Sequence, residues 1–370
     1  MNPNAILGKY LIKQIVINFL AVLLMVMGIV LMFEVIELLR RTSDRTDVDA
    51  WFIMQMAVTK LPRTLEMVFP FVMMIAAMIT FWRLSKSNEF VIIRAAGVSI
   101  WGFLTPVLFA VFTVGVLNIT VINPISAQMY EAYETLDYRF KTKNPKAVLF
   151  SDKGLWIREA IDENRFLVLQ AKSLRQEGKN LLLRDVDILE MDRNSQILKR
   201  VEAFAAVLEN KEFELKDVKV FEAGKPTLNL NNVKYQTTLT AERIKENFVD
   251  PEAISFWDLP GTIKFYEMSG FSALRHHMRY LTLLASPFML CAMVLVAAVF
   301  ALRPNNRRGG VMFLIVGGIA TGFMVYFMSQ VIYAFGINGY IPSFFAAWTP
   351  ALIAALISVS ILLHLSLIHI

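Results

Sequence analysis

Cysteine, histidine and recognisable catalytic motifs are scarce in this sequence. Its one cysteine, Cys291, stands in an apolar stretch, so no disulfide can form within the chain and any extramembrane domain is held by its own core. No G-x-x-x-x-G-K-[ST], H-E-x-x-H or C-x-x-C run is present, which leaves no nucleotide, zinc-protease or dithiol motif. We therefore expect no cofactor and no enzymatic activity. Energy for any transport has to come from a partner or a gradient.

Metal binding is not expected either. His276 and His277 are adjacent, and neighbours on a helix point about 100° apart, so the two rings cannot easily chelate one ion. His364 and His369 lie near the C-terminus. We interpret all four histidines as membrane-interface residues.

Long apolar runs are what the sequence has in abundance. Hydrophobic residues make up 56% of the 370 residues and the mean hydropathy is +0.51, more than a soluble domain usually carries. A bilayer-crossing helix needs about 20 mostly apolar residues, and six stretches supply them. We expect spans at Ile15 to Leu39, Leu61 to Trp82, Ile100 to Ile122, His276 to Leu302, Val311 to Phe335 and Ser343 to Leu365.

The distribution of positive charge predicts the orientation of these spans. The first span has no small-residue cleavage site after it, so we expect a retained signal anchor. Most basic residues of the short flanks and loops lie on the side of the N-terminus, which predicts that both termini are cytoplasmic. These residues are Lys9, Lys13, Arg83, Lys86, Arg94, Arg303, Arg307 and Arg308. Arg40, Arg41 and Arg45 in the first external loop weaken this signal. The pI near 9.3 then reflects topology and does not indicate nucleic acid.

Between the third and fourth spans lies a polar block of short strand-like runs. The runs are 166–169, 186–188, 213–215, 218–220 and 228–230, separated by turn-forming residues. They predict an all-β domain, either a β-sandwich or a curved open sheet. Residues 241–270 are expected to be helical and to return the chain to the membrane. The expected organisation is 1–122, 123–275 and 276–370.

The loop between spans two and three predicts a short amphipathic helix at about residues 84–98. Ser87 or Asn88 can cap it, Glu89 favours its positive end and Gly97 can end it. Arg83, Lys86 and Arg94 add positive charge to the same loop. The alternative is a solvated helix that lies on the lipid headgroups.

Two further sites are suggested within the spans. Glu34, Glu37 and Arg41 share one face of the first span, and Arg40, Arg41 and Arg63 could gather near it, where guanidinium groups suit phosphate. Snorkelling with an internal salt bridge is the alternative. Gly318 and Gly322, with Gly317 beside them, form a small-xxx-small face for close helix contact in the fifth span.

With these features in hand, the sequence resembles the lipopolysaccharide export permeases. The resemblance rests on the plan of three spans, an inserted domain and three spans, and on the run SNEFVIIRAAGVS at 87–99. Asn123-Pro124, Asp250-Pro251 and Gly339-Tyr340-Ile341-Pro342 add to it, and the last run resembles the G-type more than the F-type subunit.

The resemblance implies a helical polytopic fold with a jellyroll-like periplasmic domain in the bacterial inner membrane. It implies a heterodimer with a sister six-span permease, a cytoplasmic ATPase dimer that receives the Glu89 helix, and a single-span periplasmic partner. Lipopolysaccharide would enter through lateral gates formed by spans one and five, with Arg40, Arg41 and Arg63 near its phosphates. Glu34 and Glu131 stand where relatives carry basic residues, which suggests a lipid A with fewer or differently placed phosphates. A lipoprotein-releasing or other lipid-exporting permease and a membrane-embedded lipid enzyme remain alternatives.

Overall fold

The computed structural model describes most of the chain. The described residues are 3–42, 49–95, 97–141, 148–151, 154–160, 165–177, 180–192, 197–209, 212–222, 226–237, 250–268, 271–301 and 310–367. They divide into two compact units. The membrane unit comprises Met1–Tyr133, Ser255–Trp257 and Leu274–Ile370, and the inserted unit comprises Glu134–Ile254 and Asp258–Ala273.

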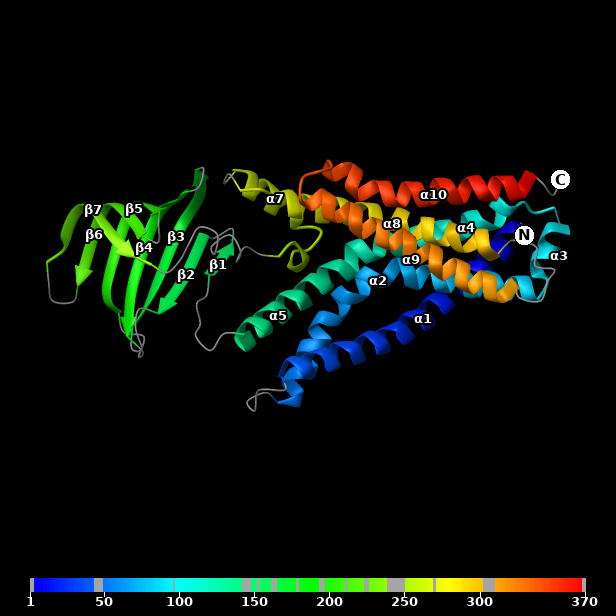
Figure 1. The fold of residues 1–370 in the computed structure, drawn as a ribbon, viewed down its shortest axis with the longest axis horizontal. Coiled ribbons are helices and arrows are strands. Elements are labelled where there is room, and N and C mark those ends of the chain that lie inside the picture. Colours follow the sequence, from blue (N-terminus) through cyan, green and yellow to red (C-terminus); the bar gives the residue numbers. More distant parts are fainter. Residues whose placement is uncertain are drawn as a thin grey trace. The chain divides into compact units, whose positions relative to one another are not determined.

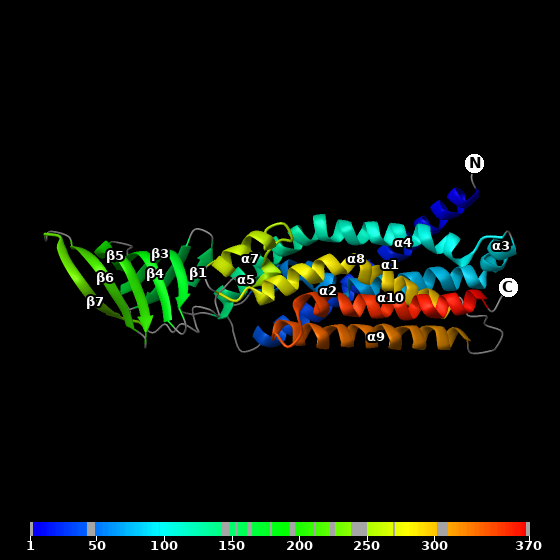
Figure 2. The ribbon, with the colours of Figure 1, turned by 90° about the horizontal axis from the view of Figure 1, so that it is seen from above.

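The membrane unit is helical (Figures 1 and 2). Six of the described helical stretches are long and apolar enough to cross a membrane, as predicted, and none of them is shorter than 22 residues. Its helices are α1 (Pro3–Thr42), α2 (Ala50–Lys86), α3 (Glu89–Ala95), α4 (Ile100–Leu117), the π-helix η1 (Asn118–Ile122), α5 (Asn123–Lys141), α8 (Leu274–Ala301), α9 (Gly310–Ile337) and α10 (Ser343–Leu367). Arg303, Arg307 and Arg308, which supported the predicted orientation, lie outside the described residues.

Two helices form the centre of this unit. The burial of the most apolar 18-residue stretch differs between the helices. In α8, 67% of this stretch is buried within the protein, and in α2 50% is, whereas in α1 and in α9 only 11% is. The core accordingly contains Phe81, Met73 and Leu104, which are almost fully inaccessible, together with the α8 run Met293–Ala298. The peripheral helices α1 and α9 keep most of their apolar side chains on the surface, as helices that face lipid or a partner do.

The inserted unit is built on one antiparallel sheet. Its seven described strands pair in the order of the sequence (Figure 1). They are β1 (Val148–Ser151), β2 (Gly154–Ala160), β3 (Arg165–Glu177), β4 (Asn180–Asp192), β5 (Ile197–Glu209), β6 (Glu212–Glu222) and β7 (Leu228–Gln236). The prediction of an inserted all-β domain is confirmed, and the described strands are connected as a meander.

Side-chain alternation shifts by one residue across the middle of the sheet. In β6 the buried residues are Phe213 and Leu215 on one side of Asp217, and Val218 and Val220 on the other. Asp217 has φ 53°, a left-handed conformation that interrupts the regular pleat. This is why the runs 213–215 and 218–220, predicted as two strands, belong to one.

Ion pairs connect neighbouring strands of this sheet. Arg200 donates to both carboxylate oxygens of Asp187, at 3.0 and 2.8 Å, and lies 2.9 Å from Glu202. The hydrogen bonds to Asp187 are the main cause that raises the pKa of Arg200 above its ordinary value. This contact ties β4 to β5 on the solvent side.

The segment that returns the chain to the membrane unit is partly helical. Residues 241–249, which were predicted to be helical, lie outside the described residues. The 3-10 turn η2 (Pro251–Ala253) and α7 (Leu259–Met268) follow, and the Asp250 carboxylate caps η2 by accepting from the Glu252 amide at 2.9 Å. Pro251 and Pro260 stand in the first turns of these two elements, a position that proline tolerates.

Candidate functional site

The short helix α3 is defined at both ends by residues in the left-handed conformation. Asn88 has φ 57° just before it, and Gly97 has φ 79° after it. The Val98 amide donates to the Ile93 carbonyl at 3.2 Å, the six-residue closure typical of a helix that ends at glycine. The sequence thus ends α2 and starts α3 within two residues, Ser87 and Asn88.

One face of α3 is anchored in the membrane unit and the other is free. Phe90 and Ile93 are buried, and the Phe90 ring lies 5.1 Å from that of Phe103 and 6.4 Å from that of Phe81. Ile92 is 66% exposed. Because an isolated seven-residue helix is unstable in water, this aromatic contact is what holds α3 in place.

The carboxylate of Glu89 is oriented by its neighbour. The Ser87 hydroxyl donates to Glu89 Oε1 at 2.7 Å. Arg83 and Lys86 are exposed on the last turn of α2, and the Lys86 ammonium lies over the Trp82 ring at 5.2 Å. Arg94 lies on α3, and its side chain is outside the described part of the structure. The end of α2 and α3 therefore present one fixed carboxylate, two cations and an apolar residue on a single small surface.

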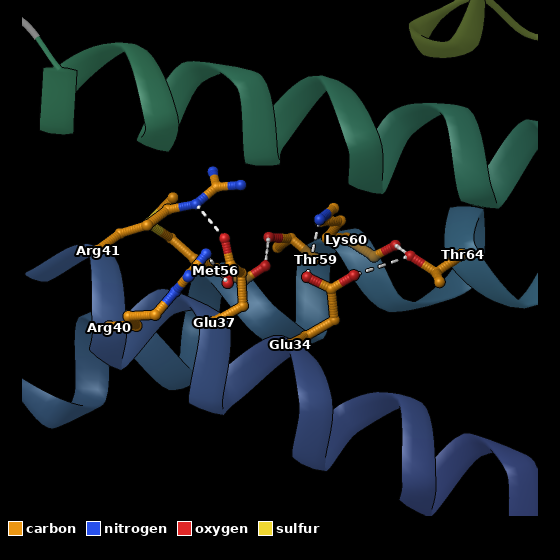
Figure 3. Close-up of polar contacts among 8 residues, drawn as sticks. All are labelled: Glu34, Glu37, Arg40, Arg41, Met56, Thr59, Lys60 and Thr64. Atoms are coloured by element: carbon orange, nitrogen blue, oxygen red, sulfur yellow. Dashed lines mark hydrogen bonds and ion pairs between the residues drawn. The ribbon is translucent and has the colours of Figure 1, made fainter.

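An ion pair joins α1 to α2 near the other end of α2 (Figure 3). Lys60 on α2 lies 2.7 Å from Glu34 on α1, and the Thr64 hydroxyl donates to the same carboxylate at 3.3 Å. The Lys60 ammonium also lies 5.6 Å from the centre of the Tyr133 ring, a cation–π distance. Glu34, unexpected in an apolar span, is thus neutralised by a partner that the sequence analysis did not identify.

The neighbouring carboxylate on α1 pairs within its own helix. Glu37 lies 2.8 Å from both Arg40 and Arg41 (Figure 3). The side chains of Arg40 and Arg41 are 77% and 45% exposed. These contacts are the internal salt bridge of the alternative interpretation. They do not contradict the other interpretation, in which Arg40 and Arg41 bind phosphate.

Arg63 is placed differently from Arg40 and Arg41. It is buried and lies 3.7 Å from Glu66, whose carboxylate also accepts from Arg279 of α8 at 2.9 Å. Asn123, 1% exposed, donates to both oxygens of Glu66 at 3.2 and 3.3 Å. Glu66, Arg279 and Asn123 did not figure as site residues in the sequence analysis. An ionisable residue inside an apolar span, such as Glu66 or Arg279, was the signal that could have found them.

The glycines of α9 face large side chains. A Cβ at Gly318 would lie 2.4 Å from the end of Met78, and one at Gly322 would lie 2.4 Å from the end of Met74, both on α2. A Cβ at Gly317 would lie 2.8 Å from the Phe300 ring on α8. The absence of side chains at these three positions therefore lets α9 approach α2 and α8.

The three described histidines belong to helices, and His369 lies outside the described residues. His276 is buried and His277 is exposed, on different faces of the first turn of α8. Among the described residues, no group of three or more His, Cys, Asp or Glu side chains could hold a metal ion.

Comparison with known proteins gives one family. The family described as "Lipopolysaccharide export system permease LptF/LptG" matches residues 9–364. The lipopolysaccharide export system permease protein LptG of Escherichia coli K12 is 22% identical over 376 aligned residues, which cover 99% of this chain and 100% of the relative. The LptG protein of Haemophilus influenzae is 23% identical over 355 residues, 94% of this chain and 95% of the relative.

Proposed function

The chain belongs to the LptF/LptG family of lipopolysaccharide export system permeases, and we propose that it is the membrane subunit that extracts lipopolysaccharide from the outer leaflet of the inner membrane. It passes the lipid to a periplasmic bridge toward the outer membrane. The observation that carries this function is the family match over nearly the whole chain, both membrane halves and the inserted unit included. The six apolar helices agree with a multi-pass inner-membrane protein.

A separate ATPase drives the cycle in this proposal. The chain has no phosphate-binding glycine loop of its own, so hydrolysis takes place in a cytoplasmic ATPase dimer. The α3 surface, with Glu89, Arg83, Lys86, Arg94 and Gly97, is the contact for this ATPase. Support for this role comes from the fixed Glu89 carboxylate and from Ile92, an exposed apolar side chain beside it. This orientation puts both termini in the cytoplasm and the inserted unit, about residues 123–275, in the periplasm.

The phosphates of the lipid contact the end of α1 where Arg40 and Arg41 lie. Both guanidinium groups are exposed enough to bind phosphate while they keep their contacts with Glu37. Arg63 is buried beside Glu66, so its contribution to phosphate binding is the positive charge that it adds nearby rather than a direct contact. Glu34 is neutralised by Lys60 and so adds no positive charge to this region, and Glu131 is exposed on α5; acidic residues at these two positions favour a lipid A with fewer or differently placed phosphates.

Helices α1 and α9 form the lateral gates in this proposal. Helices α1 and α9 bury little of their apolar surface within the chain, which suits lateral gates shared with a sister six-span permease. The glycines Gly317, Gly318 and Gly322 let α9 slide against α2 and α8 as such a gate opens. A single-span periplasmic partner would assist lipid entry at the same place.

Purification from native membranes in mild detergent tests this function. We expect mass spectrometry to identify a soluble ATPase, a sister six-span subunit and lipopolysaccharide with the chain. Recovery of a lipoprotein as the bound cargo, with no lipopolysaccharide, would instead identify a lipoprotein-releasing permease. Recovery of the chain alone would contradict the proposal, provided that an unrelated multisubunit complex of the same membranes stays assembled in the same detergent.

A further inference from the structure

A buried polar junction joins three helices of the membrane unit. Its centre is the Glu66 carboxylate of α2, which accepts from Arg279 of α8 and from the Asn123 amide at the start of α5. The Glu66 side chain is 4% exposed and that of Arg279 is 8% exposed. Burying an ion pair is costly unless its hydrogen bonds are satisfied, so such a junction holds these helices in one defined arrangement.

Asn123 connects this junction to residues that are far away in the sequence. While its Nδ2 donates to Glu66, its Oδ1 accepts from the backbone amide of Phe256 at 2.9 Å. Residues 255–257 belong to the membrane unit, although the residues before and after them belong to the inserted unit. The two ends of one side-chain amide therefore connect α2 to the tripeptide through which the chain returns from the inserted unit.

The same tripeptide makes two further contacts with the membrane unit. The Phe256 ring stacks on that of Tyr280 of α8, with centroids 5.4 Å apart and planes inclined by 13°. The indole of Trp257 donates to the Thr120 carbonyl at 3.3 Å. Thr120 lies in the π-helix η1 between α4 and α5, and π-helical turns inside longer helices often occur at functional sites. Residues 255–257 are thus held by Asn123, Tyr280 and an irregular turn.

We propose that Asn123 is a positioning residue that transmits movement of α2 to the return segment 255–257, and so couples ATP hydrolysis to the handling of lipid by the inserted unit. Helix α2 runs without interruption from Ala50 to Lys86, and its end adjoins the α3 surface that receives the ATPase. A displacement of α2 at α3 moves Glu66, and Glu66 moves Phe256 through the Asn123 amide. This inference rests on the proposed function.

Asn123→Ala in the reconstituted complex tests this role, with Asn18→Ala as the matched control. Asn18 is also an asparagine at a helix contact, donating to Thr80 Oγ1 of α2 at 2.8 Å, but it does not lie in the junction. The readouts are ATP turnover and lipopolysaccharide released per ATP hydrolysed. Loss of a hydrogen bond to a charged group changes an equilibrium by about tenfold, so we expect about tenfold less release per ATP in Asn123→Ala. ATP turnover should stay close to wild type, and Asn18→Ala should keep the wild-type ratio.

Three results would overturn the role. They are an unchanged ratio in Asn123→Ala, an equal fall in both variants, or a parallel fall of hydrolysis and release, which a merely structural residue would produce. Should Asn123→Ala fail to assemble, Trp257→Phe keeps an aromatic side chain and removes the indole N–H that donates to Thr120, together with the smaller ring that carries it. We expect a fall of roughly threefold in release per ATP for it, and an unchanged ratio would refute the role. A wild-type complex that hydrolyses ATP and releases no lipopolysaccharide would refute the proposed function, and this inference with it.

Discussion

Among the described glycines, Gly115 of α4 is the one that lies against the backbone of another helix. A Cβ at this position would lie 2.6 Å from the Pro287 Cα and 2.8 Å from the Pro287 Cβ of α8. Carbon atoms in good contact are about 3.5–4.0 Å apart, so α4 and α8 would have to separate by roughly 1 Å to accept Gly115→Ala. Because the obstacle is backbone, no rotamer change relieves it. Overpacking of this kind costs about 1–3 kcal/mol.

Two other glycines provide matched controls in the same kind of helix. A Cβ at Gly28 would meet nothing within 4 Å, so Gly28→Ala brings only the gain in helix propensity, up to about 1 kcal/mol. A Cβ at Gly322 would meet the terminal atoms of Met74, a flexible side chain that can turn away. We therefore expect Gly322→Ala to cost less than about 1 kcal/mol and Gly115→Ala to be the most destabilising of the three.

Thermal stability of the purified protein in detergent measures this order. The fraction that stays monodisperse after heating should give a midpoint for Gly115→Ala roughly 2–6 °C below wild type. Gly28→Ala should match or exceed wild type. If Gly115→Ala melts at the same temperature as Gly28→Ala, then α4 and α8 are not as close as the structure has them, and the packing argument fails.

Two further variants test the ion pair and the α3 surface. Lys60→Met leaves the Glu34 carboxylate without its ammonium partner, which should destabilise the protein by about 3 kcal/mol. The double variant Lys60→Met/Glu34→Met should melt close to wild type. Equal melting temperatures of the single and double variants would show that the pair is not formed. Glu89→Ala should remove a charge-assisted contact of about 1.5–3 kcal/mol with the ATPase and so lower lipid-stimulated hydrolysis. Lys9→Ala serves as a control on the cytoplasmic side. Unchanged assembly and unchanged lipid release in Glu89→Ala would exclude this contact.

The sequence predicts the helices well, because length and hydropathy suffice for a span. Each predicted span lies largely within a described helix, and α1 and α2 extend beyond the predictions, to Thr42 and back to Ala50, because polar residues at their ends are still helical. The strands β1, β2 and β5 were missed. In β5 the buried positions include Ala203 and Ala206, which carry little β signal, and the exposed positions mix Arg200 with apolar residues such as Phe204.

Contacts between distant residues could not be predicted from one sequence. Glu66 and Arg279 are 213 positions apart, and no periodicity links them. For the same reason Arg63 was predicted to gather with Arg40 and Arg41, whereas in the structure it lies 3.7 Å from Glu66. Gly115 was overlooked because a lone glycine has no pattern, and its importance lies in Pro287 of another helix.

The charges of α2 explain why this helix is a suitable transmitter. Lys60, Arg63 and Glu66 lie within two turns, and their described contacts reach three other helices: Lys60 reaches α1, while Glu66 reaches α8 and α5. Such groups cost free energy to bury, and removing one partner leaves the other uncompensated. A movement of α2 must therefore either take α1, α5 and α8 with it or break an ion pair with α1 or α8, or the hydrogen bond between Glu66 and Asn123 of α5. Because breaking these buried contacts costs more free energy, α2 and its three neighbours should move together. Relative motion should be concentrated at α9, where Gly318 and Gly322 face Met78 and Met74 of α2 and the Tyr326 ring lies 5.9 Å from that of Phe71.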